Sequence, residues 1–295
     1  MKNKSSVEMR FVSCNLCNSS HFDDLYVDEL KGDYPEATYA FNIDTRKTFK
    51  IVRCKECGLI FTNPMPKMES FYTETIDEIY LNSEKQRRST AENSLKQIIK
   101  FQTTGKLLDI GCSTGIFLDA AQKYFQVEGI ELSNWAANSA SKKHKVYREP
   151  LNKIAAKTKY QVITLWGVVE HFEDPRTELR AIAEALIPGG LLVVYTGDID
   201  AWLPKLLGKK WWWFQGMHLY YFSKRTLTKM LEYIGFEVIA SQNHKIYFQL
   251  FSLAISLQRY KISKLINPIL NLKFFRNIQI PIKISGEMVL FARKL

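Results

Sequence analysis

The sequence predicts an α/β fold in which a mostly parallel sheet carries helices on both faces, preceded by a smaller module rich in cysteine. From residue 105 onward, short apolar segments alternate with segments of helical periodicity, which is the pattern of βαβ units. Before residue 66, two C-x2-C pairs indicate a small metal-binding module. We therefore expect a cysteine module over 1–66, a helical linker or lid over 67–104, and the large domain over 105–295.

Composition and charge restrict the class of protein. The chain has 295 residues, 46% of them hydrophobic and 24% charged, which is typical of a folded globular protein. It opens with MKNKSSVEMR and shows no apolar secretory signal and no apolar run of the roughly 20 residues that a bilayer span needs. These features favour a cytoplasmic protein. The net charge of +11 favours an acidic partner, which could be nucleic acid, anionic lipid or a phosphorylated substrate.

The first two segments that the pattern defines are the cysteine pairs "CNLC" and "CKEC". Their cysteines are Cys14, Cys17, Cys54 and Cys57. Four thiolates on two tight turns suit a tetrahedral zinc ion. The alternative is a pair of redox dithiols or disulfides, which the absence of a secretory signal and of a thioredoxin-like context disfavours. Alternating segments between the pairs, such as "TYAFNI" and "FKIVRC", predict short antiparallel strands and hence a zinc ribbon.

The linker over 67–104 is expected to be helical. Residues 67–102 lack glycine and proline and show helical apolar spacing at Leu95, Ile98 and Ile99. Tyr72 and Tyr80 lie in this segment, where they either pack or form part of a lid over a pocket.

The large domain then alternates strand and helix. Expected strands are "KLLDI", "QVEGIEL", "YQVITLWG", "GGLLVVYTG", "FEVIAS" and "EMVLFARK". Expected helices are "GIFLDAAQKY", "NWAANSASKK", "RTELRAIAEALI" and "KRTLTKMLEYI". Ligands of such sheets bind beyond the carboxyl ends of the strands.

A sharp turn follows the first of these strands. Gly111, Ser113 and Gly115 allow the backbone to approach a ligand closely. Glu131 ends the second strand about 20 residues later, where a carboxylate accepts hydrogen bonds from both hydroxyls of a ribose. The turn lacks the complete triphosphate and dinucleotide patterns. A nucleoside without a pyrophosphate, such as S-adenosylmethionine, suits this pattern.

These segments resemble the class I S-adenosylmethionine-dependent methyltransferases. "LLDIGCSTGIF", "VEGIELS", "VITLWGVVEHFEDP" and "ALIPGGLLVVYT" are similar to four motifs of that family, in the same order. The cysteine pairs, the stretch "TGDIDAWLPKLLGKKWWWF" followed by "HLYYFSKRTLTKMLEYIGF", and the ending "GEMVLFARK" resemble the zinc-ribbon methyltransferases of bacterial surface-polysaccharide synthesis. The resemblance implies a Rossmann-like sheet of seven strands with the last one antiparallel.

The resemblance also implies a cofactor site and two departures from it. The residues expected to contact S-adenosylmethionine are Asp109, Gly111, Cys112, Ser113, Gly115, Glu131, Leu132 and Trp166. Ser113 stands where the family often has glycine. Gly167 stands where an acidic residue often precedes the "VLEH" stretch, so a contact to the sulfonium end of the cofactor is missing at that position.

Three residues are candidates for the catalytic base. His171 follows the strand that ends in "LWG", His218 lies in "GMHLYYFS", and Asp198 follows "VVYTG". Histidine suits proton transfer because its unperturbed pKa is about 6.5. The alternatives are packing or capping for His171, a structural hydrogen bond for His218 and a turn cap for Asp198. We take His218 as the first candidate.

Two insertions are expected to cap the site, near 200–220 and near 244–285. The first contains Trp211, Trp212 and Trp213, which either pack in a core or contact a ring of the substrate. The second is apolar and basic, with Glu287 as the one acid from residue 241 onward. It is expected to form a helical cap; the alternative is contact with a membrane surface.

The sequence therefore predicts an enzyme that transfers a methyl group to a sugar hydroxyl in surface-polysaccharide or glycolipid synthesis. Its acceptor would be a sugar or glycan, free or linked to a nucleotide or lipid. The alternatives are an RNA methyltransferase that uses the ribbon and the basic surface, a sugar C-methyltransferase, and a non-catalytic binding module. The absence of an N-P-P-[FYW] motif counts against methylation of base amino groups, so a nucleic acid partner is disfavoured.

Overall fold

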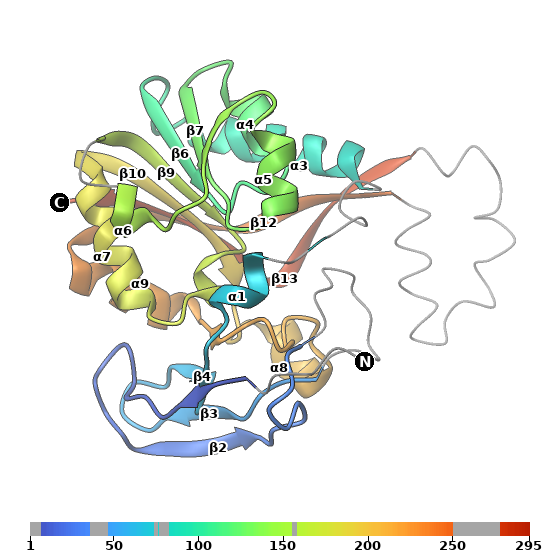
Figure 1. Cartoon of the computed structure of the whole chain (residues 1–295), viewed down its shortest axis with the longest axis vertical. Coiled ribbons are helices and arrows are strands. Elements are labelled where there is room, and N and C mark those ends of the chain that lie inside the picture. Colours follow the sequence, from blue (N-terminus) through green and yellow to red (C-terminus); the bar gives the residue numbers. More distant parts are fainter. Residues whose placement is uncertain (1–6, 36–46, 74–75, 77–82, 155–157, 250–277) are drawn as a thin grey trace, which may run out of the picture.

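The computed structural model describes residues 7–35, 47–73, 76, 83–154, 158–249 and 278–295. Within these ranges the chain forms a seven-stranded sheet, a four-stranded sheet and a two-stranded sheet. Figure 1 shows the seven-stranded sheet with helices on both sides and the smaller sheets beneath it.

The seven-stranded sheet confirms the predicted fold class. Its strand order is β12-β13-β10-β9-β6-β7-β8. The strands are β6 (Lys106–Ile110), β7 (Gln126–Ile130), β8 (Lys145–Tyr147), β9 (Tyr160–Trp166), β10 (Leu186–Gly197), β12 (Phe236–Gln249) and β13 (Gln279–Lys294). Neighbours from β8 to β10 are parallel, whereas β13 is antiparallel to both β10 and β12. The sequence analysis missed β8 because three residues give too short a pattern.

Helices cover both faces of this sheet because successive side chains of a strand point to opposite sides. Leu108 of β6 packs with α7 and α9, whereas Leu107 packs with α3 and α4. The helices are α1 (Glu69–Thr73), α3 (Glu84–Ile98), α4 (Ile116–Ala121), α5 (Asn134–Ala140), α6 (Leu151–Ile154), α7 (Pro175–Ala185), α8 (Trp202–Leu207) and α9 (Lys224–Ile234), with 3₁₀ turns η2 (Val169–His171) and η3 (Gly208–Lys210).

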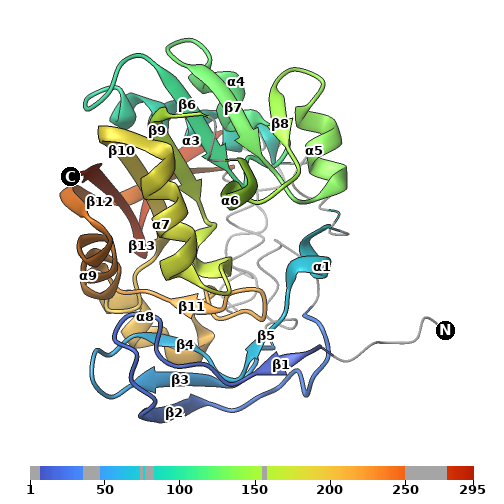
Figure 2. The ribbon, with the colours of Figure 1, turned by 60° about the vertical axis from the view of Figure 1, so that its left-hand side comes forward.

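The cysteine module forms the expected antiparallel strands but does not complete its own sheet. The strands are β1 (Met9–Arg10), β2 (Phe22–Tyr26), β3 (Ile51–Cys54), β4 (Ile60–Thr62) and β5 (Met65–Pro66), and β1 pairs with β5. The four-stranded sheet has the order β11-β4-β3-β2. Its edge strand β11 (Tyr220–Tyr221) comes from the large domain and lies beside β4 (Figure 2). The expected strand "TYAFNI" falls entirely in 36–46, outside the described residues.

The second expected insertion differs from the prediction at both of its ends. Residues 245–249 and 279–283 do not begin and end a helical cap; they continue β12 and β13, which pair from Lys245 with Lys283 to Gln249 with Gln279. The apolar alternation in these arms suits a strand as well as a helix, which explains the error. Residues 250–277 lie outside the described part of the chain.

Within the described residues, no helix has both the length and the apolar character that a membrane span requires.

Candidate active site

The turn between β6 and α4 lies in the left-handed region of backbone conformation. Gly111, Ser113 and Gly115 have φ values of +72°, +48° and +86°, a region that glycine adopts at little cost. A Cβ atom on Gly111 would lie 2.6 Å from Cγ2 of Val168, so the turn packs directly against the loop that follows β9. The turn therefore lies at the carboxyl ends of two neighbouring parallel strands, where sheets of this kind bind ligands.

Glu131 follows β7 and faces this turn. Its carboxylate accepts hydrogen bonds from the backbone N–H groups of Ser113 and Ser133, each at 2.8 Å. Burial raises the pKa of the Glu131 carboxyl, and these N–H groups oppose that shift. A carboxylate held beside a turn of this shape fits a cofactor that carries a ribose, as S-adenosylmethionine does.

Asp109 and Cys112 lie beneath the turn. Thr164 Oγ1 donates to Asp109 Oδ1 at 2.6 Å and so joins β9 to β6. Burial raises the pKa of Asp109 to about 8. Cys112 Sγ lies 2.5 Å from the position that a Cβ atom on Gly129 would take, so this thiol fills the space beside β7. Asp109 and Cys112 therefore pack between the turn and the neighbouring strands, β9 and β7.

The other two predicted cofactor residues, Leu132 and Trp166, lie at the same edge of the sheet. Leu132 directly follows Glu131, and Trp166 ends β9. The Trp166 ring centroid lies 5.1 Å from that of Phe117 on α4 and 5.8 Å from that of His244 on β12. Its Nε1 atom is buried and has no hydrogen-bond partner in the described structure. The predicted set thus gathers at the carboxyl ends of β6, β7 and β9.

A carboxylate and two imidazoles form a cluster beside this edge. Glu170, His171 and His218 each place a carboxylate oxygen or ring nitrogen within 4.8 Å of the others. Glu170 and His171 belong to η2, whereas His218 precedes β11. The two imidazole ring centroids are 4.8 Å apart. The two histidines singled out from the sequence therefore meet in space.

Carbonyl partners fix the tautomer of both imidazoles. The Nδ1–H group of His218 donates to the carbonyl of Trp213 at 2.7 Å, and its Nε2 atom accepts from Gln215 Nε2 at 2.9 Å. The Nδ1–H group of His171 donates to the carbonyl of Met217 at 2.9 Å. Burial lowers the pKa of His171 to about 4 and that of His218 well below its usual value. Each Nε2 atom is therefore unprotonated at neutral pH. That of His218 accepts from Gln215, so it can act as a general base only when the acceptor hydroxyl takes the place of that amide.

Glu170 is buried, with 1% of its surface exposed, and only one of its oxygens has a donor. Thr196 Oγ1 donates to Glu170 Oε2 at 3.0 Å. Oε1 is buried and has no hydrogen-bond partner among the described residues. Burial raises the pKa of Glu170 to about 8, and the nearby Glu287 carboxyl raises it further.

Aromatic side chains of the first insertion pack around this cluster. Trp211, Trp213 and Phe214 are buried, and the Trp213 ring centroid lies 5.0 Å from that of His218. The tryptophan run thus contributes mainly to a core, and one of its members borders the histidine pair.

Glu287 of β13 is a buried acid that the sequence analysis did not place in the site. Tyr195 Oη donates to one carboxylate oxygen at 2.9 Å, and Trp212 Nε1 donates to the other at 3.1 Å. Burial raises the pKa of Glu287 to about 7. The signal for it was available, since Glu287 is the one acid in the basic segment that ends the chain.

Asp198 and Tyr72 have different positions relative to the cluster. Asp198 Oδ1 accepts from the backbone N–H groups of Asp200 and Lys224, both at 3.2 Å, which is a turn-capping arrangement. Among the described residues, Asp198 makes no hydrogen bond or ion pair with either histidine. Tyr72 of α1 donates its hydroxyl to the carbonyl of Met217 at 3.1 Å and lies 3.2 Å from His171 Nδ1, so the linker contributes to the site.

The four cysteines of the ribbon come together as a group. Their Sγ atoms all lie within 4.8 Å of one another, with separations of 3.4 Å for Cys14–Cys57 and 3.5 Å for Cys17–Cys54. A tetrahedron with Zn–S bonds of about 2.3 Å has S–S separations of about 3.8 Å. Burial raises the pKa of the Cys57 thiol to about 11, a shift that a bound cation would oppose. The cluster fits zinc.

Both cysteine turns dock on the large domain. Asn15, inside the first turn, donates to Asp174 Oδ1 at 2.7 Å and accepts from the backbone N–H of Arg176 at 2.7 Å. Arg225 at the start of α9 donates to the carbonyl of Cys57 at 3.0 Å. The four-cysteine cluster is therefore held against the amino ends of α7 and α9.

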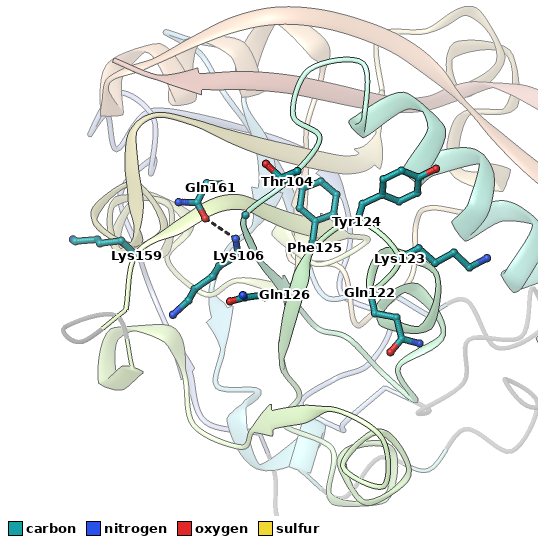
Figure 3. A pocket seen from close by; sticks show the side chains of 10 residues that line it. Thr104, Lys106, Gln122, Lys123, Tyr124, Phe125, Gln126, Lys159 and Gln161 are labelled. Atoms are coloured by element: carbon teal, nitrogen blue, oxygen red, sulfur yellow. Dashed lines mark hydrogen bonds between the residues drawn. The ribbon is translucent and has the colours of Figure 1, made fainter.

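A surface hollow lies at the opposite edge of the sheet. Figure 3 shows Lys106, Gln126 and Gln161 around it, at the amino ends of β6, β7 and β9. Ligands of parallel sheets bind at the carboxyl ends, so this hollow is not the predicted cofactor site.

Comparisons with known proteins agree with this geometry. A family model described as a methyltransferase domain matches residues 83–241, which is more than half of the chain. A ubiquinone biosynthesis O-methyltransferase from Leptothrix cholodnii is 34% identical over 111 residues, or 32% of this chain and 47% of that protein. The matched part thus spans about half the length of this curated relative.

Among solved structures, a SAM-dependent methyltransferase from Archaeoglobus fulgidus matches with a TM-score of 0.52 and 17% identity. The match covers 74% of this chain and 100% of that one. At this identity the likeness concerns the fold.

Proposed function

The chain belongs to the methyltransferase-domain family and carries the domain of an S-adenosylmethionine-dependent methyltransferase, and we propose that it transfers the methyl group to a sugar hydroxyl in the synthesis of a surface polysaccharide or glycolipid. The acceptor would enter between the cofactor edge of the sheet and the histidine cluster.

The observation that carries this proposal is the pair of neutral histidines, of which His218 is buried and His171 is partly buried. Methylation of a hydroxyl releases its proton, and a base near the acceptor oxygen accelerates the transfer. The Nε2 atom of His218 is unprotonated because its Nδ1–H group is committed to the Trp213 carbonyl, and the acceptor hydroxyl would take the place of the Gln215 amide that donates to Nε2. His171 lies within 4.8 Å of it and has the same tautomer. Two neutral bases at the end of β9 suit removal of a proton from an alcohol.

Two further features support oxygen as the acceptor atom and a sugar as its bearer. The curated relative is named as an O-methyltransferase. Trp213 and Tyr72 lie beside the histidines, and aromatic faces commonly contact sugar rings. The cysteine turns and the tryptophan segment also resemble those of polysaccharide methyltransferases, as the sequence analysis describes. Zinc in the ribbon has a structural role in this proposal.

The test is an acceptor screen. Purified protein is incubated with methyl-labelled S-adenosylmethionine and with nucleotide sugars, glycolipids or total RNA, and the label is located in the product by NMR. We expect label on a sugar oxygen and none with His218→Ala. Label on a sugar carbon, or on RNA with a strong salt dependence, would contradict the proposal.

A further inference from the structure

The residue that follows β9 is a glycine, so this position has room for a side chain and carries no charged group. Gly167, with φ of +70°, stands there. The next residue, Val168, contacts the turn at Gly111, so Gly167 lies between the cofactor turn and the histidine cluster. The sequence analysis expected an acidic side chain at this position in relatives and a missing contact to the sulfonium end of the cofactor.

A carboxylate oxygen from the next turn approaches this space. A Cβ atom on Gly167 would lie 3.5 Å from Glu170 Oε1 and 3.9 Å from the Tyr195 ring. Oε1 is the oxygen of Glu170 that has no donor, and the whole residue is 1% exposed. A buried oxygen of this kind costs free energy unless a partner compensates for it.

We propose that Glu170 Oε1 contacts the methyl-bearing sulfonium of S-adenosylmethionine and so takes the place of the acid that is missing at position 167. This inference rests on the proposed function only in that S-adenosylmethionine is the methyl donor. Without a neighbouring cation, burial raises the pKa of Glu170 to about 8; a bound sulfonium opposes that shift and favours the ionised carboxylate. A sulfonium has a positive charge and no N–H group, so this carboxylate reaches it through charge and polarised C–H groups alone. A carboxylate oxygen that has no hydrogen-bond donor suits a sulfonium. A neutral hydroxyl or amide group in place of the sulfonium would compensate only part of the charge on that carboxylate.

After methyl transfer, the Glu170 carboxylate would lie near the imidazolium that forms on His218. The S–CH₃ bond breaks with its electron pair left on sulfur, the acceptor oxygen forms the new C–O bond, and its proton passes to Nε2 of His218. The sulfonium becomes a neutral thioether, and the imidazolium that forms lies within 4.8 Å of Glu170. Glu170 therefore binds S-adenosylmethionine more tightly than S-adenosylhomocysteine, and the weaker binding of the product helps its release.

The test compares two ligands that differ in this charge. S-adenosylmethionine and S-adenosylhomocysteine are titrated by calorimetry into the zinc-loaded protein without acceptor. With Glu170→Gln we expect affinity for S-adenosylmethionine to fall about tenfold or more, the loss typical of a contact to a charged group. Affinity for S-adenosylhomocysteine should change less than about threefold. Glu128→Gln is the matched control, because Glu128 lies on β7 away from Glu170 and its carboxylate has donors in Tyr147 and Tyr160, so the ratio of affinities should stay at the wild-type value.

Three outcomes would overturn the inference. The first is an equal loss for both ligands, which indicates a structural role. The second is no loss for either. The third is a second divalent metal per chain that disappears in Glu170→Gln, which makes Glu170 a metal ligand together with the two histidines. If the amide variant does not fold, Glu170→Asp, which withdraws the charge by one methylene, should show the same selective loss. Failure of the wild type to bind S-adenosylmethionine would instead contradict the proposed function.

Discussion

At the scale of single residues, burial favours the neutral form of the ionisable side chains around the site. It lowers the pKa of His171 and of His244 to about 4 and raises that of Glu170 to about 8. A protonated histidine would repel a sulfonium and could not accept a proton. At neutral pH the imidazoles of the site are therefore uncharged, so they do not repel a sulfonium, and they can accept a proton.

His218→Ala should lower turnover by about 10²–10⁴-fold, the usual contribution of a general base. Binding of S-adenosylmethionine should remain nearly unchanged, because the predicted cofactor residues lie at the ends of other strands. Turnover, cofactor affinity and melting temperature are measured on the same variant. The exposed His21 offers a control, and His21→Ala should leave all three unchanged. A loss of turnover below about tenfold would move the role of base to His171.

Glu131→Ala should weaken S-adenosylmethionine binding by roughly 1.5–3 kcal/mol, the range for hydrogen bonds to a charged group. The carboxylate also holds the N–H of Ser113, so the turn loses a brace together with the ribose contact. Calorimetry measures the affinity. Glu128→Ala is the matched control, since Glu128 lies on β7, the strand that Glu131 follows, but accepts from Tyr147 and Tyr160. Equal effects of the two substitutions would refute the assignment.

At the scale of elements, the main observation is that β11 completes the ribbon sheet. Tyr220 pairs with Phe61 and Tyr221 with Ile60. The residue just before β11, Leu219, accepts from the N–H of Thr62 and donates its own N–H to the carbonyl of Glu170, both at 2.8 Å. The backbone that carries His218 is therefore held between the ribbon and η2.

Removal of the metal should disturb this link before it disturbs the cofactor site. In Cys54→Ser we expect loss of the single zinc, faster hydrogen exchange at the amides of Thr62 and Leu219, and a fall in turnover. Affinity for S-adenosylmethionine should stay within about threefold, because β6 and β7 lie outside the ribbon. Cys112→Ser is the control for zinc content and for exchange at Thr62 and Leu219, since its thiol lies outside the four-cysteine cluster. Unchanged exchange at Thr62 and Leu219 after zinc loss would contradict this link.

The elements also show what the sequence could predict. Helices α7 and α9 were predicted because their apolar residues recur at intervals of three and four residues, a pattern that can be read from neighbouring sequence alone. The pairing of β11 with β4 was missed, since two residues have no periodicity and the partner strand is distant in sequence. The sequence also did not predict that Glu170 Oε1 lacks a hydrogen-bond donor. The surroundings of this oxygen include Thr196, which is distant in sequence, and they form only when the chain folds.

At the scale of the whole molecule, buried acids and buried histidines oppose each other as pH changes. An acid whose folded pKa exceeds its unfolded value stabilises the fold at low pH, and that contribution is lost as pH rises through the folded pKa. Histidines with lowered pKa act in the opposite direction, since the fold loses stability as pH falls below their unfolded value. Intermediate pH should therefore be optimal for stability.

Glu287→Gln isolates one acid from this balance. The folded pKa of Glu287 is about 7, above the usual value of 4.5, so this carboxyl lowers the stability of the wild type between pH 5 and pH 7. The amide variant lacks that contribution and keeps those of Asp109 and Glu170. The difference in unfolding free energy should move in favour of the variant by up to about 1.4 kcal/mol per pH unit. Urea unfolding at pH 5, 6 and 7 measures it, with the exposed Glu8→Gln as control. A difference that is constant with pH would contradict the assigned shift.

The shared ribbon sheet also affects the order in which the protein can form during synthesis. All four cysteines have left the ribosome once Cys57 has emerged, so zinc can bind early. The partners that hold the ribbon come much later, since Asn15 bonds to Arg176, 161 residues further on, and β11 follows later still. During translation the nascent ribbon therefore exposes an unpaired β4 edge, which remains open to a wrong partner until the tryptophan segment emerges.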